Sequence, residues 1–191
     1  MKKFINSMFM MIAVAAAALG FSASAAETAK EPIITIKTNM YAENGSTNSF
    51  TLLFGGTKGE YIDVDCGFGT TEYELEEAVF DSESGGVNAV SVTCNVSEAG
   101  VVKIYGNAEA IDYFNADGCE ITEIDLSKLT NLDILSLNHN KLKALDLTPN
   151  SKLRALYLSD NEFSAETPLK VGGNKPGMTI MDLSIIAHMD Q

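Results

Sequence analysis

The sequence predicts a mainly β chain with a small N-terminal β-sandwich, followed by a short solenoid whose coils stack into a parallel sheet. Two observations predict this fold. Short apolar runs alternate with glycine-rich turns up to about residue 100, without a useful helical periodicity. From about residue 101 onward, aliphatic residues recur every 21 residues. The predicted organisation is a leader over 1–26, a cap domain over 27–100 and a repeat domain over 101–191.

The first 26 residues have the composition of a secretory signal peptide. Lys2 and Lys3 form a positive start, residues 8–19 are apolar, and residues 22–26 supply small side chains for cleavage. A membrane-spanning helix needs about 20 apolar residues, so this stretch is too short for an anchor. We therefore expect an exported protein, secreted or at the cell surface, with no membrane span in the mature chain.

The net charge argues against nucleic acid as a partner. The chain carries 13 basic and 26 acidic residues, for a net charge of −13. Loss of Lys2 and Lys3 with the leader leaves 11 basic and 26 acidic residues, for a net charge of −15. Such a chain repels phosphate backbones and anionic lipid.

The N-terminal half contains five candidate strands and two candidate disulfide cysteines. The strands are expected near residues 33–38, 50–54, 61–66, 73–78 and 88–96. Cys66 and Cys94 each end an alternating run, so both thiols should point inward with the aliphatic residues. They could be bridged, or they could be two small buried hydrophobic side chains, and the sequence leaves both alternatives open.

One stretch of this half resembles a known module. Residues 63–70 read Asp-Val-Asp-Cys-Gly-Phe-Gly-Thr, which is similar to the strand and turn of PKD-like sandwich modules with their tryptophan-glycine-aspartate-glycine turn. Cys66 stands for the tryptophan and Phe68 for the aspartate, so two of four hallmark positions differ. The resemblance implies an extracellular β-sandwich and carries over no functional residue.

The repeat is defined by five positions that each occur three times, 21 residues apart. These sets are Ile111, Leu132, Leu153; Phe114, Leu135, Leu156; Ala116, Leu137, Leu158; Cys119, Asn140, Asn161; and Ile121, Leu142, Phe163. They match L-x-x-L-x-L-x-x-N/C-x-L, the signature of leucine-rich repeats. Each leucine should pack on its copies in neighbouring coils, and the asparagine amides should donate to carbonyl groups of a neighbouring coil. Cys119 should fill the asparagine slot as a small buried side chain.

A second register lies on the return side of each coil. Residues 121–126 read Ile-x-x-Ile-x-Leu and residues 142–147 read Leu-x-x-Leu-x-Leu. This arrangement resembles internalin-like bacterial surface proteins with leucine-rich repeats, over about residues 101–163. The resemblance implies a right-handed horseshoe with a concave parallel sheet, and protein binding or adhesion as its function.

The register breaks after Phe163. Residues 180–185, Ile-x-x-Leu-x-Ile, look like the next strand, which makes the preceding repeat 27 residues long and places His188 in the asparagine slot. A solenoid needs a polar cap at each end, and no cap follows this strand. We therefore expect the repeat domain to be incomplete at its C-terminus.

No catalytic, metal or cofactor motif is found in the sequence. His139 and His188 belong to no zinc motif, and there is no nucleophile elbow or phosphate-binding glycine loop. Cys119 with His139 could be considered a nucleophile pair, but the repeat places Cys119 in an interior slot. We expect a protein that is not an enzyme and needs no cofactor.

The concave face supplies the candidate binding residues. We expect its solvent-facing positions to contact a protein or glycan outside the cell: Tyr113, Asn115, Asp117, Ile134, Ser136, Asn138, Arg154, Tyr157 and Ser159. One alternative is that the chain is the non-catalytic targeting part of a larger surface enzyme, and another is a structural spacer. The ligand, the mode of attachment and the oligomeric state do not follow from the sequence.

Overall fold

The structure, a computed structural model, describes residues 30–40, 49–80, 87–97, 99–164, 169–171 and 179–180. The predicted leader lies outside the described residues. From Glu31 onward the chain belongs to one compact unit. Its described residues form β-strands in several sheets and a 3-10 helix over Ala108–Ala110. The prediction of a mainly β chain is confirmed.

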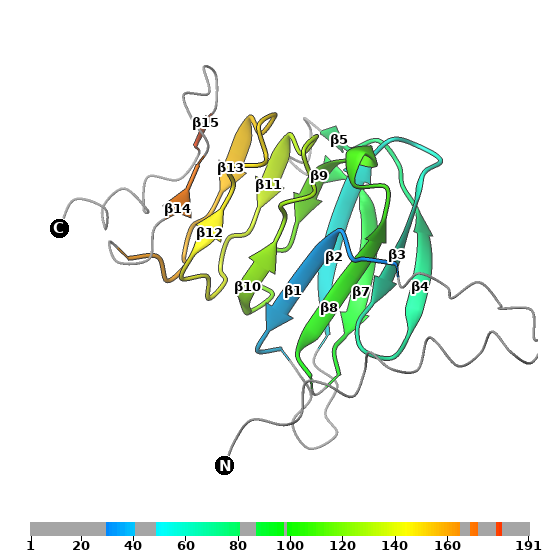
Figure 1. Ribbon diagram of the computed structural model, residues 1–191, viewed down its shortest axis with the longest axis horizontal. Helices are drawn as coiled ribbons and strands as arrows, with labels where there is room; N and C mark the ends of the chain where they lie inside the picture. The colour runs from blue at the N-terminus through cyan, green and yellow to red at the C-terminus, as the bar shows by residue number, and fades with distance from the viewer. Residues whose placement is uncertain are drawn as a thin grey trace, which may run out of the picture. The chain divides into compact units, whose positions relative to one another are not determined.

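Two large sheets account for most of the strands (Figure 1). The first sheet is antiparallel throughout and has the order β10 (Ile121–Asp125), β1 (Ile34–Thr38), β8 (Val101–Gly106), β3 (Tyr61–Asp65) and β4 (Thr70–Glu74). The second sheet has the order β15 (Thr179–Ile180), β13 (Ala155–Tyr157), β11 (Ile134–Ser136), β9 (Ile111–Asn115), β2 (Ser49–Gly56) and β7 (Val90–Asn95). Two small sheets pair β12 (Leu145–Asp146) with β14 (Leu169–Lys170), and β5 (Val79–Phe80) with β6 (Val87–Asn88).

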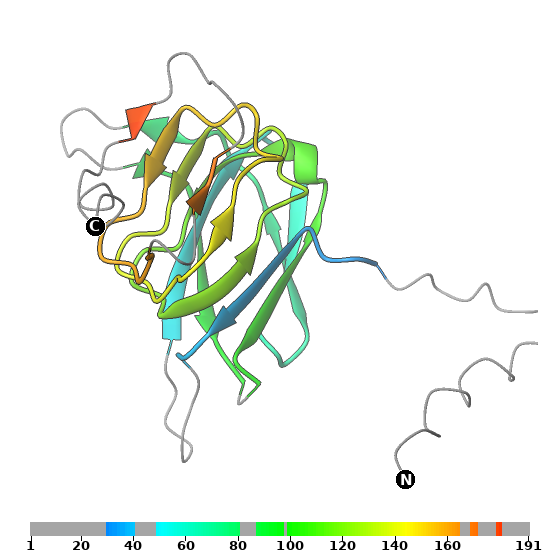
Figure 2. The same ribbon diagram turned by 60° about the vertical axis from the view of Figure 1, so that its left-hand side comes forward.

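The two large sheets form two layers, as the turned view shows (Figure 2). One hydrophobic core contains residues of both sheets. Strands alternate between buried and exposed side chains, so that Ile34 and Ile36 of β1 face inward and Lys37 faces out. In the second sheet, Phe54 of β2 lies beside Phe114 of β9, with ring centroids 5.0 Å apart. Each such buried side chain stabilises the fold by about 1.5–3 kcal/mol.

A disulfide joins the two sheets at one end. Cys66 follows β3, Cys94 lies in β7, and their Cα atoms are 5.7 Å apart. Of the two alternatives that the sequence leaves open, the structure contains the bridge. Closing a 28-residue separation restricts the unfolded chain, which contributes roughly 3–4 kcal/mol in the chain-entropy model.

Both large sheets continue across the predicted boundary at residue 100. β9 pairs antiparallel with β2, and β10 pairs antiparallel with β1. β11 and β13 then extend the second sheet in parallel, each one repeat further along the chain. The N-terminal strands and the 21-residue repeats therefore share their sheets and their core.

The parallel strands have a 21-residue register. Phe114, Leu135 and Leu156 lie opposite one another in β9, β11 and β13, and all three are fully buried. The next register is 24 residues, since Leu156 pairs with Ile180 and Leu145 pairs with Leu169. The expected 27-residue repeat is therefore wrong. Residues 180 and 183 are both aliphatic, so the sequence pattern allows either register.

The asparagine slot carries a ladder of side-chain hydrogen bonds. The Asn140 amide nitrogen donates to the Ala116 carbonyl of the preceding repeat (2.8 Å), and its oxygen accepts from the Ile121 amide (2.9 Å). Asn161 repeats this arrangement one coil later, donating to the Leu137 carbonyl (2.8 Å). Cys119, in the same slot, is fully buried. The predicted structural role of this slot is confirmed.

Candidate functional site

The structure brings eight of the nine predicted binding residues onto one face of the second sheet. The ninth, Arg154, differs from the expectation, because Ala155 lies beside Ile134 and Arg154 lies in the row of Asp133. In parallel register, Tyr113 lies beside Ile134, and Asn115 lies beside Ser136. Ser136 in turn lies beside Tyr157. These side chains alternate with the core residues of β9, β11 and β13, so they point away from the shared core.

Tyr113 is buried, so the expectation that it faces solvent is wrong. Only 5% of it is exposed, because the segment after β4 crosses this part of the sheet. The Gly56 amide donates to the Glu76 carbonyl (3.0 Å). A Cβ atom at Gly55 would lie 2.4 Å from the Cβ of Ala78 and 3.0 Å from that of Tyr113. Burial, the largest cause, raises the pKa of Tyr113.

Ser136 is also buried, with 7% of it exposed, which again differs from the expectation. Its hydroxyl donates to the two carboxylate oxygens of Asp117, at 2.8 and 2.9 Å. The same carboxylate accepts the Asn138 backbone amide (2.7 Å) and the Asn115 side-chain amide (3.2 Å). Asp117 therefore organises the polar residues around it, and Ser136 has no hydroxyl hydrogen left to donate to a ligand.

The bond at Asp117 recurs one repeat later. The Asn138 side-chain oxygen accepts the Ser159 backbone amide at 2.8 Å, as the carboxylate of Asp117 accepts that of Asn138. Positions 117, 138 and 159 thus join successive 21-residue repeats at the ends of the parallel strands. These three predicted site residues are half-buried and act first in holding the neighbouring strands together.

A charged row lies at the start of the same three strands, within β9 and directly before β11 and β13. Asp112, Asp133 and Arg154 are spaced by 21 residues, and Arg154 holds the Asp133 carboxylate through two nitrogens, Nε at 2.5 Å. Burial, followed by the charge of Asp133, raises the pKa of Asp112. The Arg154 side chain remains 76% exposed, so its outer surface can contact a partner.

Ile134 and Tyr157 are the apolar members of the predicted set that stay partly exposed. They lie on adjacent strands and are offset by two residues, because Ile134 is opposite Ala155 and Tyr157 is opposite Ser136. With Arg154 beyond them, they form a small accessible surface, which we call the β11–β13 face. Aromatic and arginine side chains of this kind are frequent anchors in protein interfaces.

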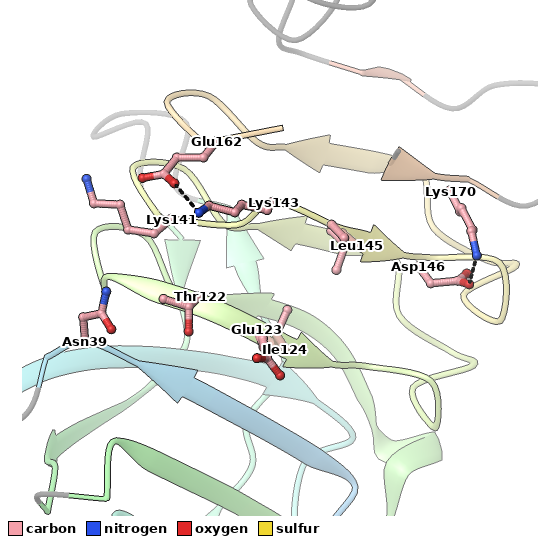
Figure 3. Close-up of a pocket in the computed structure, with 11 residues that line it drawn as sticks. Asn39, Thr122, Glu123, Ile124, Lys141, Lys143, Leu145, Asp146, Glu162 and Lys170 are labelled. Atoms are coloured by element: carbon pink, nitrogen blue, oxygen red, sulfur yellow. Dashed lines mark ion pairs between the residues drawn. The ribbon is translucent and has the colours of Figure 1, made fainter. Parts of the chain in front are cut away.

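The sequence did not indicate the hollow beside β10, β12 and β14 (Figure 3). Its volume is about 710 Å³, and residues of β10, β12 and β14 line it. Lys143 points toward Glu162 (3.7 Å) and Lys170 toward Asp146 (3.6 Å). Three lysines and three carboxylates line it in all, so the hollow has no excess charge to attract an ionic ligand.

The thiol of Cys119 has no nucleophilic character. It is fully buried, and burial, followed by the charge of Asp117, raises its pKa to about 12. With this pKa the side chain stays protonated at neutral pH. Because the thiolate is the reactive form, the protonated thiol is a poor nucleophile. Among the residues that the structure describes, no three histidine, cysteine, aspartate or glutamate side chains could hold a metal ion.

Comparisons of the chain with family models, curated proteins and solved structures find no match. The described residues include no helix that is long and apolar enough to cross a membrane.

Proposed function

We propose that this chain is an exported binding module built as a β-sandwich followed by leucine-rich-repeat coils, and that it contacts a protein outside the cell. The sequence supports export through its positive, apolar and small-residue leader. The 21-residue parallel register and the asparagine ladder support the repeat coils.

The binding surface that we propose is the β11–β13 face. The observation that carries it is the parallel register, which places Ile134 and Tyr157 on adjacent strands. The exposed Arg154, directly before β13, pairs with Asp133, the residue before Ile134. Tyr113 and Ser136 are left out because they are buried. A shallow surface with aromatic, aliphatic and charged side chains suits another protein, since interface anchors combine these types.

The experiment is a screen of the purified protein against an array of extracellular proteins, followed by titration of each ligand found. We expect Tyr157→Ala to weaken binding by about tenfold or more, as loss of an interface anchor does. Thr93→Ala is the matched control, because Thr93 is exposed on β7 at the far side of the same sheet. Ligands that bind the Tyr157→Ala and Thr93→Ala variants with equal affinity would exclude the β11–β13 face.

A further inference from the structure

A tight turn between β3 and β4 displays one aromatic side chain almost completely. Phe68 is 78% exposed, more than the other exposed large hydrophobic residues of the described chain, Val79 at 53% and Tyr61 at 49%. Glycine stands on both sides of it, so its ring projects from a narrow backbone. Isolated exposed apolar residues are common, and what distinguishes Phe68 is how its turn is held.

Four contacts fix this turn and the residue before it. The Asp65 carboxylate accepts the amides of Gly67 (2.8 Å) and Gly69 (3.3 Å). Cys66, next to the turn, is bridged to Cys94 of β7, and its carbonyl accepts the Ser97 amide at 3.0 Å. The aromatic residue is therefore presented by a constrained backbone.

Gly67 closes the turn against its neighbour. Its φ of +100° lies in the region that favours glycine, and a Cβ atom at this position would lie 2.0 Å from the Ser97 hydroxyl oxygen. Ordering a side chain at an interface costs about 0.5–1.5 kcal/mol, and part of this cost is avoided where the backbone is already fixed.

We propose that Phe68 is a preorganised anchor that inserts into an apolar pocket of a partner protein whose rim carries lysine or arginine side chains. This surface belongs to the first sheet and is separate from the β11–β13 face of the second sheet. A ring on a narrow turn fits into a pocket better than it fits against a flat surface, because a pocket can bury its two faces and its edge.

The charge beside the turn determines the kind of rim. Along the strands that flank it, Ile62 and Val64 face the core, so the alternate residues face outward. Asp63 lies opposite Glu72, and Tyr61 lies opposite Glu74. Glu74, at the end of these strands far from Phe68, is the largest cause of the raised pKa of Tyr61. Lys103 of β8 lies opposite Asp65, but residues 61–74 carry four acidic side chains and no basic one, so this hairpin has a net negative charge. A cationic rim complements it and increases the rate of association.

Lipid and sugar fit this surface less well than protein does. The carboxylates of β3 and β4 repel anionic headgroups, and a single phenylalanine contributes little membrane affinity. A sugar site needs polar groups beside the aromatic ring to fix the ligand. Next to Phe68, the Asp65 carboxylate already accepts two backbone amides.

The test uses peptides selected from a random-peptide display library against the purified protein, with affinities measured by fluorescence anisotropy. Selected peptides should combine basic and large apolar residues. Phe68→Ser should lower their affinity by about tenfold or more, as loss of an interface anchor does. The matched control is Val79→Ser, which removes another exposed apolar side chain and should change affinity by less than about twofold. Melting curves of both variants should match that of the unmodified protein.

A second variant tests the preorganisation itself. Asp65→Ala keeps Phe68 but removes the acceptor of two turn amides, so peptide affinity should fall by about threefold or more. Backbone ¹⁵N order parameters at residues 67–69 should fall from the value of about 0.85 that is typical of rigid backbone.

Four results would overturn the proposal: peptides that bind Phe68→Ser unchanged, selected peptides without basic residues, a turn that is already mobile in the unmodified protein, or Phe68-dependent binding to phosphatidylglycerol vesicles. The last result would identify a lipid surface as the partner. None of them bears on the β11–β13 face, which has its own controls.

Discussion

The N-terminal strands and the 21-residue repeats share a core, but they are held together differently. The N-terminal strands pair antiparallel with partners at varied distances along the chain; they are β1, β2, β3, β4, β7 and β8. A disulfide joins the residue after β3 to β7. β9, β11 and β13 pair with one another in parallel, so equivalent positions make the same kind of contact in successive repeats. Some of these positions hold a buried apolar side chain, one holds an asparagine, and one holds a side-chain oxygen that accepts a backbone amide. A single substitution in the repeats therefore breaks contacts between two neighbouring repeats at once.

The largest effect should come from the asparagine ladder. Asn140→Ala removes the acceptor for the Cys119 and Ile121 amides and the donor to Ala116, all of them in buried surroundings. Leaving such groups without partners should lower the free energy of unfolding by roughly 3–5 kcal/mol. Urea denaturation measures this. Asn88→Ala, at an exposed position of β6, is the control and should change stability by less than about 0.5 kcal/mol. Equal effects would mean that the ladder does not form.

The disulfide gives the corresponding test of the N-terminal strands. Replacing both Cys66 and Cys94 by serine should cost roughly 2–4 kcal/mol, because the unfolded chain is no longer restricted. Amide hydrogen exchange should show the largest loss of protection in β3 and β7, and β11 and β13 should change less. A uniform loss across both regions would show that the two regions unfold as one cooperative unit.

Gly55 tests the contact that buries Tyr113. Gly55→Ala places a Cβ atom against Ala78 and Tyr113, and we expect overpacking to cost about 1–3 kcal/mol. The segment around residue 78 should move away, so the tyrosine becomes more accessible to acrylamide quenching or chemical iodination. Ser91→Ala, an exposed position in β7 of the same sheet, should leave both stability and accessibility unchanged. A Gly55→Ala variant as stable as the original would mean that residue 78 does not pack here.

The smallest effect concerns two carboxylates with opposite pKa shifts. The Ser127 amide, which donates to Asp125 at 2.9 Å, lowers the pKa of Asp125, whereas burial raises that of Asp112. A depressed pKa stabilises the fold above the unfolded value of about 3.9, and this contribution is lost as pH falls through the folded pKa. For Asp112 the sign is reversed, and stability falls as pH rises through its raised pKa.

Asp125→Asn should therefore destabilise the protein at pH 7 and have no effect well below about pH 3, whereas Asp112→Asn should stabilise it slightly at pH 7. Both groups are largely exposed, so each effect should stay below about 0.5–1 kcal/mol. Urea denaturation of both variants between pH 3 and pH 7 measures the difference. Stability changes of the same sign for both variants at pH 7 would contradict the opposite pKa shifts of the two carboxylates.

The sequence predicted the repeats better than the surface that they present. Leu135, Leu156 and Asn140 follow from periodicity alone, because each equivalent residue meets the same local surroundings in every coil. The burial of Tyr113 could not be predicted, since it depends on the path of a segment some 35 residues earlier, which no local pattern encodes. The disulfide also depended on a distance between strands of different sheets.

Two other features lay beyond periodicity for related reasons. The register at Ile180 was ambiguous because residue 183 is equally aliphatic. The hollow is lined by β10 and β12, which belong to different sheets, because β10 pairs with β1 and β12 pairs with β14. This arrangement depends on strands from distant parts of the chain.

The most direct test of the repeat register is NMR measurement of couplings across backbone hydrogen bonds. The amide of Ala116 should couple to the carbonyl carbon of Ser136, and the amide of Leu137 to that of Tyr157, since both bonds are 2.9 Å long in the structure. These two couplings would establish that successive strands pair in parallel with the 21-residue offset. Couplings from these amides to other carbonyl groups, or amides that exchange with solvent as fast as unprotected ones, would contradict the register and the binding face proposed from it.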